Sequence, residues 1–265
     1  MKKIIEAIHT SLWKIKLFLE ESIRKIQYKE KLKESLRFQD KYTEGQRCFI
    51  IGNGPSLKDE DLEKIAQHGD VSFAANRIYN VFSDVTWRPT YYGVCDIKLF
   101  NNSREEINKV TGTKFIPLDI YSKFANVKDD YYVWSRIPVT FFNRPPKFSN
   151  NMTDRFGEGG TITYHFLQMA VAMGFKEIYL IGIDFSFSYG IGPDGKYFED
   201  KTVKHNHHGR DNSKLDTVPN LYNQIRAYKK ANDYAQKNGI HIYNATRGGK
   251  LEVFKRVDFD SLFKV

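Results

Sequence analysis

The feature that most constrains this chain is a helix followed at once by an apolar strand. Residues 161–173 contain neither glycine nor proline, and they are predicted to form a helix that Gly174 ends. Residues 177–185, with the sequence EIYLIGIDF, then form a nearly continuous apolar run. Such runs are typical of strands that are buried on both faces, as in parallel sheets. This unit therefore predicts an α/β fold.

The same alternation extends over most of the chain. Further strands are predicted at residues 48–51, 71–75, 90–95 and 241–244, and more weakly at 114–118 and 131–134. Further helices are predicted at residues 59–68 and 221–238. Together these elements predict a Rossmann-like, mostly parallel sheet flanked by helices, in a domain of residues 46–265. Ligands of such sheets bind beyond the carboxyl ends of the strands, so the loops after strands are the first candidates for a site.

One long segment interrupts this alternation. Residues 186–219 are rich in Gly, His, Asp, Asn and Lys and show no apolar periodicity. Long irregular segments in compact domains are often functional lids. We therefore expect residues 186–219 to form a lid-like loop.

The N-terminal segment, residues 1–44, is different in character. It has eleven Lys/Arg against seven Asp/Glu, no Gly and no Pro, and Gly45 marks its boundary. Its apolar residues at positions 5, 8, 12, 15, 19 and 26 follow a helical, nearly heptad spacing. A basic amphipathic helix is therefore predicted. It could pack on its own domain or on a second subunit, lie on an anionic membrane, or act as an arm for nucleic acid.

Composition excludes several classes of protein. The net charge of +9 suits nucleic acid, an anionic membrane or a phosphorylated substrate, although we do not expect nucleic acid as the partner. Two cysteines exclude a disulfide scaffold and disfavour a cysteine-based zinc site, which indicates a reduced, cytoplasmic protein. No apolar run approaches the roughly 20 residues that span a bilayer, so any membrane association should be peripheral.

The first candidate site is the loop directly after the first predicted strand. Its sequence is Gly52-Asn53-Gly54-Pro55-Ser56. The two glycines allow the backbone to approach a ligand closely, and the start of the following helix favours phosphate. Neither the Walker ending nor the third glycine of the dinucleotide fingerprint is present. The alternative is an ordinary tight turn.

Further polar residues follow the other predicted strands. Asn76 and Asp96 come after the second and third strands, and Asp184 lies near the end of the most apolar strand. A second glycine-rich helix start, Gly159-Gly160-Thr161, could bind another anion. Each of these residues could equally be structural, as a cap, a turn or a flexible loop.

The predicted lid-like loop holds groups that could act as acids, bases or ligands. His205, His207 and His208 lie there with Tyr189 and Tyr197. Histidine titrates near neutrality and can act as a general base. The spacing could also suit a metal, but no cysteine or HExxH pattern supports one, so we expect no metal site.

Several segments together resemble two related families. They are GNGPSL at 52–57, ANR at 75–77, GFKEIYLIGIDF at 174–185, NATRGGKL at 244–251 and RVDFD at 256–260. They are similar to bacterial sialyltransferases that use a CMP-activated sugar. They resemble more closely a family named after archaeal 6-hydroxymethylpterin diphosphokinases, which includes motility-associated flagellin glycosyltransferases. The resemblance covers roughly residues 46–262.

The resemblance implies roles for particular residues. By analogy with the sialyltransferases, Asn53, Ser56 and Asn76 would hold the CMP moiety. Asp96 matches a nucleotide contact in place but not in type, and the helix start at 160–161 would lie at the nucleotide. Two tyrosines contact the phosphate there, and Tyr189 and Tyr197 are the candidates here, although neither aligns cleanly.

The sequence departs from the sialyltransferase pattern at the general base. That family has a histidine just before the last helix, where this chain reads LDTVPN at 215–220. His207 and His208 lie about ten residues upstream and could serve only if the loop folds back. Otherwise Asp184 or another acid would have to act as the base.

Three functions follow as hypotheses. The first is a glycosyltransferase that moves an acidic sugar from a CMP-type nucleotide donor to a surface glycan or glycolipid, without a cofactor. The second is an ATP- and Mg²⁺-dependent pyrophosphokinase acting on a hydroxymethylpterin, with Asp96 and Asp184 as candidate metal ligands. The third is a non-catalytic nucleotide-binding or assembly protein whose N-terminal helix oligomerises.

Overall fold

The computed structural model describes residues 2–124, 130–137, 146–203 and 218–264, with side chains from residue 8 onward. Its centre is a nine-stranded sheet whose neighbouring strands all pair in parallel, in the order β11-β10-β7-β1-β2-β3-β4-β5-β6. The strands are β1 Arg47–Ile51, β2 Val71–Ala75, β3 Tyr91–Gly93, β4 Thr113–Pro117, β5 Tyr131–Arg136, β6 Arg155–Phe156, β7 Glu177–Ile181, β10 His241–Asn244 and β11 Lys255–Arg256. The predicted α/β, Rossmann-like fold with a parallel sheet is confirmed.

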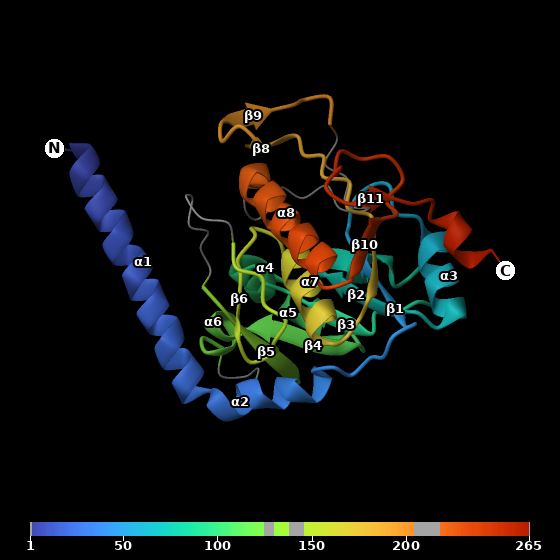
Figure 1. The fold of residues 1–265 in the computed structure, drawn as a ribbon, viewed down its shortest axis with the longest axis horizontal. Coiled ribbons are helices and arrows are strands. Elements are labelled where there is room, and N and C mark those ends of the chain that lie inside the picture. The colour runs from blue at the N-terminus through green and yellow to red at the C-terminus, as the bar shows by residue number, and fades with distance from the viewer. Residues whose placement is uncertain (1, 125–129, 138–145, 204–217, 265) are drawn as a thin grey trace.

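Helices cover both faces of this sheet (Figure 1). The α-helices after the N-terminal segment are α3 Asp59–His68, α4 Ile97–Asn102, α5 Arg104–Asn108, α6 Leu118–Tyr121, α7 Ile162–Ala172 and α8 Leu221–Lys237. Short 3₁₀ turns are η2 Asn76–Val81 and η4 Asp260–Phe263. Two separate hydrophobic clusters lie on opposite faces of the strands, because successive side chains of a strand point to opposite sides.

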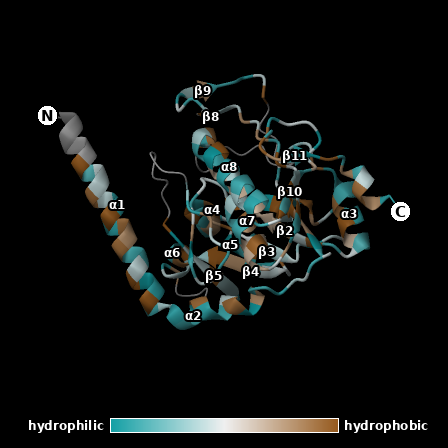
Figure 2. Ribbon diagram, viewed as in Figure 1, coloured by the Kyte–Doolittle hydropathy of each residue, from teal (hydrophilic) through white to brown (hydrophobic). Residues whose placement is uncertain are grey.

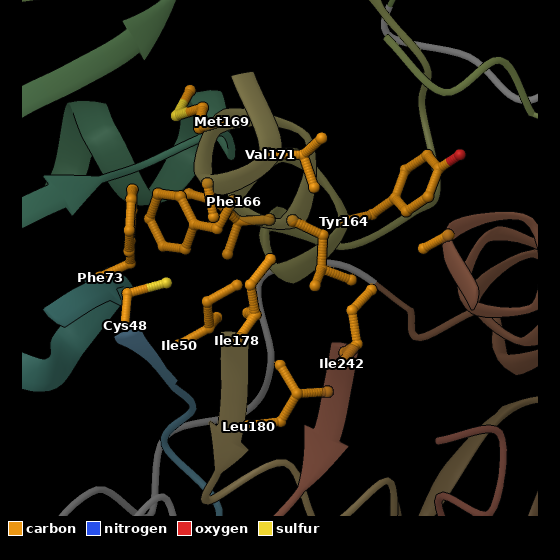
Figure 3. Close-up of a cluster of buried hydrophobic side chains, with 14 of the residues drawn as sticks. Cys48, Ile50, Phe73, Tyr164, Phe166, Met169, Val171, Ile178, Leu180 and Ile242 are labelled. Carbon is orange, nitrogen blue, oxygen red and sulfur yellow. The ribbon is translucent and has the colours of Figure 1, made fainter. Parts of the chain in front are cut away.

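Helix α7 forms the centre of one of these clusters (Figure 3). All eleven of its residues are buried, so it is apolar around most of its circumference. Phe166 and Met169 of α7 belong to the same buried cluster as Ile50 of β1 and Ile178 and Leu180 of β7. Burial of such side chains contributes roughly 1.5–3 kcal/mol each, which fixes the start of α7 relative to the ends of these two strands.

The N-terminal segment is helical but not one continuous helix. It forms α1 Lys2–Gln27, α2 Lys29–Glu34 and the 3₁₀ turn η1 Ser35–Phe38. The chain turns at Tyr28, and Leu32 and Phe38 are buried in the two hydrophobic clusters. The heptad-like spacing, which ends at position 26, predicts α1 correctly. The single helix predicted for residues 1–44 is instead divided at Tyr28, and Leu32 and Phe38 beyond the break pack into the domain. No helix in the described ranges is both long enough and apolar enough to cross a membrane.

The segment at 186–219 is more regular than expected. Strands β8 Tyr189–Ile191 and β9 Tyr197–Glu199 form a two-stranded antiparallel sheet, and residues 204–217 lie outside the described ranges. Gly195 adopts φ 79° in the connecting turn, a left-handed conformation that glycine accommodates without strain. The hairpin was not predicted because its strands have only three residues each, too few for a periodic pattern.

Candidate functional site

The candidate site lies where the strand order reverses. From β1 the sheet grows in one direction through β2 to β6, and in the other through β7, β10 and β11. The loops after β1 and β7 therefore leave the sheet on either side of a crevice, which is where ligands bind in open parallel sheets. A cavity of about 910 Å³ occupies this position.

Most of the residues predicted for the site line this cavity. They are Gly52, Asn53, Gly54, Pro55, Asn76, Asp96, Gly160, Thr161 and Asp184. Ser56 and Gly159 are adjacent in sequence but are not part of the lining. Because the lining residues come from the ends of β1, β2, β3 and β7 and the start of α7, the fold brings five separate segments to one cavity.

The glycine loop after β1 packs tightly against the end of β7. The amide of Gly54 donates to the carbonyl oxygen of Gly182 over 2.9 Å, and Ser56 Oγ donates to Asp184 Oδ2 over 2.7 Å. A Cβ atom on Gly52 would collide with the carbonyl of Gly182, and one on Gly54 would collide with the Asp184 carboxylate. The two glycines are thus required by this close approach.

Asp184 is both a structural partner of the loop and a titratable group of the cavity. Burial raises the pKa of its carboxyl group above the ordinary value, and the hydrogen bond from Ser56 opposes part of that shift. A carboxylate with a raised pKa can exchange a proton closer to neutral pH than an exposed one. Asp184 can therefore hold the loop through a hydrogen bond and also have a chemical role, the two alternatives that the sequence leaves open.

The two asparagines are held by the strands they follow. Asn53 Nδ2 donates to the carbonyl oxygen of Ala75 over 3.0 Å, which ties the loop after β1 to the end of β2. Asn76 has φ 56°, a left-handed conformation that Asn tolerates better than most residues, and its carbonyl accepts from Tyr92. Its buried Oδ1 has no hydrogen-bond partner among the described residues. An unsatisfied polar atom on a cavity wall is a candidate ligand contact.

Helix α7 begins at the cavity. Thr161 is its N-cap, and the Thr161 side chain accepts from the amide of Thr163 over 3.3 Å. Gly160 has φ 70°, and its carbonyl accepts from Gln224 of α8 over 3.2 Å. The free amides at a helix start favour an anion, and this start opens into the cavity.

Asp96 has a structural role in addition to its position on the cavity wall. It is the N-cap of α4, where its Oδ1 accepts from the amides of Lys98 and Leu99 over 2.8 and 3.0 Å. Because one carboxylate oxygen is committed to these two bonds, Asp96 can offer only its remaining oxygen to a ligand.

A charged network lies along one wall of the cavity. Arg136, at the end of β5, donates through Nε to Asp119 Oδ1 over 3.0 Å and through Nη1 to Glu158 Oε2 over 3.3 Å. His165 Nε2 lies 3.5 Å from the same Glu158 oxygen. Burial alone would raise the pKa of Glu158, but His165, Arg136 and the amide of Gly160 lower it to about 2. Glu158 therefore stays ionised and holds the loop before α7.

Positive charge remains at the cavity after these pairings. Arg77, Lys98 and Lys123 also line it. Among the residues that the structure describes, the ammonium groups of Lys98 and Lys123 form no ion pair. The four lining carboxylates, by contrast, are engaged by Arg136, by Ser56 or by a helix cap. The cavity can therefore accept an anionic ligand.

Tyr189 and Tyr197, two of the residues predicted for the site, are not among the described residues that line the cavity. Tyr189 and Tyr197 lie in the β8–β9 hairpin, and Tyr197 is 62% exposed. His205, His207 and His208 fall within 204–217, outside the described residues. Their proposed roles as phosphate contacts and general base remain predictions.

The sequence did not indicate several residues of the site. Arg136 lies two residues beyond the strand predicted at 131–134. Strand β5 extends to Arg136, so a prediction with the correct end would have placed Arg136 at the carboxyl edge of the sheet. Asn223, Gln224 and Tyr228 reach the cavity from the first turns of α8. No local pattern indicates them, because their position depends on how α8 packs beside α7.

Comparisons with known proteins agree with this architecture. The model of the family described as 6-hydroxymethylpterin diphosphokinase MptE-like matches residues 20–190. No sequence among the curated proteins is significantly similar. A solved structure of the MAf glycosyltransferase from Magnetospirillum magneticum AMB-1 superposes with a TM-score of 0.52 and 18% identity. The superposition covers 84% of this chain but only 35% of that protein, so the likeness is one of fold over about a third of its length.

Proposed function

Since the chain belongs to the 6-hydroxymethylpterin diphosphokinase MptE-like family, we propose that it is a glycosyltransferase. The donor would be a CMP-activated acidic sugar, and the acceptor a surface glycan or glycolipid. The fold shared with the MAf glycosyltransferase supports the reaction class, and the sequence resemblance to sialyltransferases supports the donor. The reaction would take place in the cytoplasm, with the protein peripheral at the inner face of the cell membrane.

One observation carries this proposal. Asn53, Asn76 and Thr161, which the resemblance assigns to the nucleotide, line one cavity although they are far apart in sequence. The phosphate would lie at the start of α7, in the cavity that Lys98 and Lys123 also line. The unpaired Oδ1 of Asn76 would accept a hydrogen bond from the nucleotide.

The proposed reaction moves one sugar and one proton. An acceptor hydroxyl oxygen bonds to the anomeric carbon, and the bond from that carbon to the phosphate oxygen breaks, which releases CMP with the bonding electron pair. The helix start and nearby cations would stabilise the charge on the leaving phosphate. The hydroxyl proton passes to a general base, for which Asp184 is the candidate among the described residues.

The pyrophosphokinase alternative rests on the family description. It would require Mg²⁺ to neutralise the charge of the transferred phosphates, and Asp96 and Asp184, which both line the cavity, would be its candidate ligands. Asp96 has already committed one oxygen to the cap of α4, and Asp184 one to Ser56. The described residues contain no group of three or more His, Cys, Asp or Glu side chains placed to hold a metal, so Mg²⁺ would depend largely on the substrate phosphates.

A thermal-shift panel tests the proposal directly. The full chain is heated with CMP, with a CMP-activated acidic sugar, with ATP and Mg²⁺, and with a hydroxymethylpterin. We expect stabilisation by CMP and its sugar without metal, because ligands that bind only the folded state raise Tm. Stabilisation by ATP and Mg²⁺ alone would favour the pyrophosphokinase, and no response would favour a non-catalytic protein.

A further inference from the structure

Helix α1 carries a row of apolar side chains that its own domain leaves uncovered. Ile8, Leu12, Ile15, Leu19, Ile23 and Ile26 follow three- and four-residue spacings, so they lie on one face of the helix. Each is more than half exposed, from 53% for Ile8 to 78% for Ile26. We call these six residues the outer stripe. Figure 1 shows α1 along one side of the molecule, and Figure 2 shows apolar residues recurring along it.

The opposite face of α1 is fixed to the domain. Glu21 is fully buried, and its Oε1 accepts from Ser135 Oγ over 2.6 Å and from the amide of Arg136 over 3.2 Å. Arg155 donates to Ser22 Oγ over 3.1 Å, and its guanidinium lies 4.4 Å from the centre of the Phe18 ring. Glu21 is two positions from both Leu19 and Ile23, or about 200° around the helix, so the outer stripe points away from the domain.

Helix α1 as a whole carries an excess of basic residues. Helix α1 has six Lys/Arg and three Glu over residues 2–27. Glu20 lies 3.2 Å from Arg24 and 3.9 Å from Lys16, and Glu21 is buried, which leaves basic groups in excess. A coiled coil between two copies would bring basic groups beside the stripe, such as Lys16, close to those of the second copy. An anionic lipid surface complements the same groups.

The inner face of the same helix borders the candidate site. Thr10, Trp13 and Lys14 line the cavity. A single rigid element thus has an apolar outer face, a basic excess and an inner face at the cavity. We propose that α1 is an interfacial helix that inserts the outer stripe among anionic lipid headgroups and holds the cavity beside the membrane. This proposal concerns lipid binding and does not depend on the identity of the sugar donor.

Vesicle flotation with the full chain tests this proposal. Wild type should float with phosphatidylcholine vesicles that contain phosphatidylglycerol, and much less with phosphatidylcholine alone, with binding weakened by salt. The Leu12→Glu/Leu19→Glu variant should partition at least about tenfold less, because it places two charges on the inserted face. It should fold normally, since both leucines are exposed, and circular dichroism and Tm check this.

The matched control is Gln67→Glu/Gln236→Glu, which adds the same charge at exposed positions of α3 and α8. It should bind vesicles like wild type. Equal flotation of the stripe variant and wild type would overturn the proposal, as would the absence of wild-type binding to anionic vesicles. A dimer that the stripe variant dissociates, seen by analytical ultracentrifugation without vesicle binding, would identify a second copy as the occupant.

Discussion

At the scale of single residues, Asp184 both holds a loop of the candidate site and contributes a titratable group to its cavity. Its Oδ2 accepts from Ser56, which holds the glycine loop after β1. The same carboxylate lines the cavity, and burial raises its pKa. A carboxylate with a raised pKa is suited to the proposed role of accepting a proton from an acceptor hydroxyl.

The Asp184→Asn variant separates these two roles. The amide keeps an oxygen that can accept from Ser56, so the loop should hold and donor affinity should change little. The amide cannot accept the proton, so kcat should fall by about 10²–10⁴-fold. In wild type, kcat should rise with pH through the raised pKa of Asp184, because the base must be ionised. Steady-state measurement of CMP release gives both parameters.

His207→Ala and His208→Ala are the comparison variants for this experiment. If they abolish turnover while Asp184→Asn retains it, the base lies in the loop and Asp184 is a structural residue.

Asn53, Asn76 and Asp184 could be found from sequence because each follows, or ends, an apolar strand. The residues contributed by α8, such as Gln224, could not, since their position depends on tertiary packing.

At the scale of elements, the network around Arg136 connects β5 with α6 and with the loop before α7. Glu158 accepts from Arg136 and from the amide of Gly160, and its pKa is lowered to about 2. A carboxyl group whose pKa is lowered on folding stabilises the folded state above its ordinary pKa. That stability is lost as pH falls from about 4.5 towards 2, because the unfolded chain binds the proton first.

We therefore expect Glu158→Gln to lower the free energy of unfolding at neutral pH by an amount on the order of 2–3 kcal/mol. The difference from wild type should shrink as pH falls towards about 3. Urea denaturation over this pH range measures both effects. Glu105→Gln, at an exposed position of α5, is the control and should change stability little. A pH-independent difference would mean that Glu158 acts through packing and not through its charge.

Elements were predictable where the local pattern is long enough. The strands around β1 and β7 and the helices α7 and α8 have apolar runs or glycine stops that are visible in sequence. Helices α4, α5 and α6 have only four to six residues, too few to show a helical period. The break after α1 was missed because the packing of Leu32 and Phe38 on the domain determines it.

At the scale of the whole molecule, the topology makes distant segments share one cavity. Because β1 and β7 are neighbours and the chain leaves them in opposite directions, loops more than a hundred residues apart meet at one end of the sheet. The rules for parallel pairing and crossover connections could predict that the candidate site lies at the carboxyl ends of the strands. The cavity wall supplied by α1 could not be predicted, because it depends on how Glu21 anchors that helix.

The most direct test of the account is the affinity of CMP, measured by isothermal titration without divalent metal. Wild type should bind CMP, and Gln236→Glu, on the exposed side of α8, should bind it equally. Asn76→Gly should bind at least about tenfold more weakly, because it removes the side-chain amide of a residue that lines the cavity while glycine keeps the left-handed backbone. Equal affinity in Asn76→Gly, or no binding of CMP by wild type, would contradict the assignment of this cavity to a nucleotide.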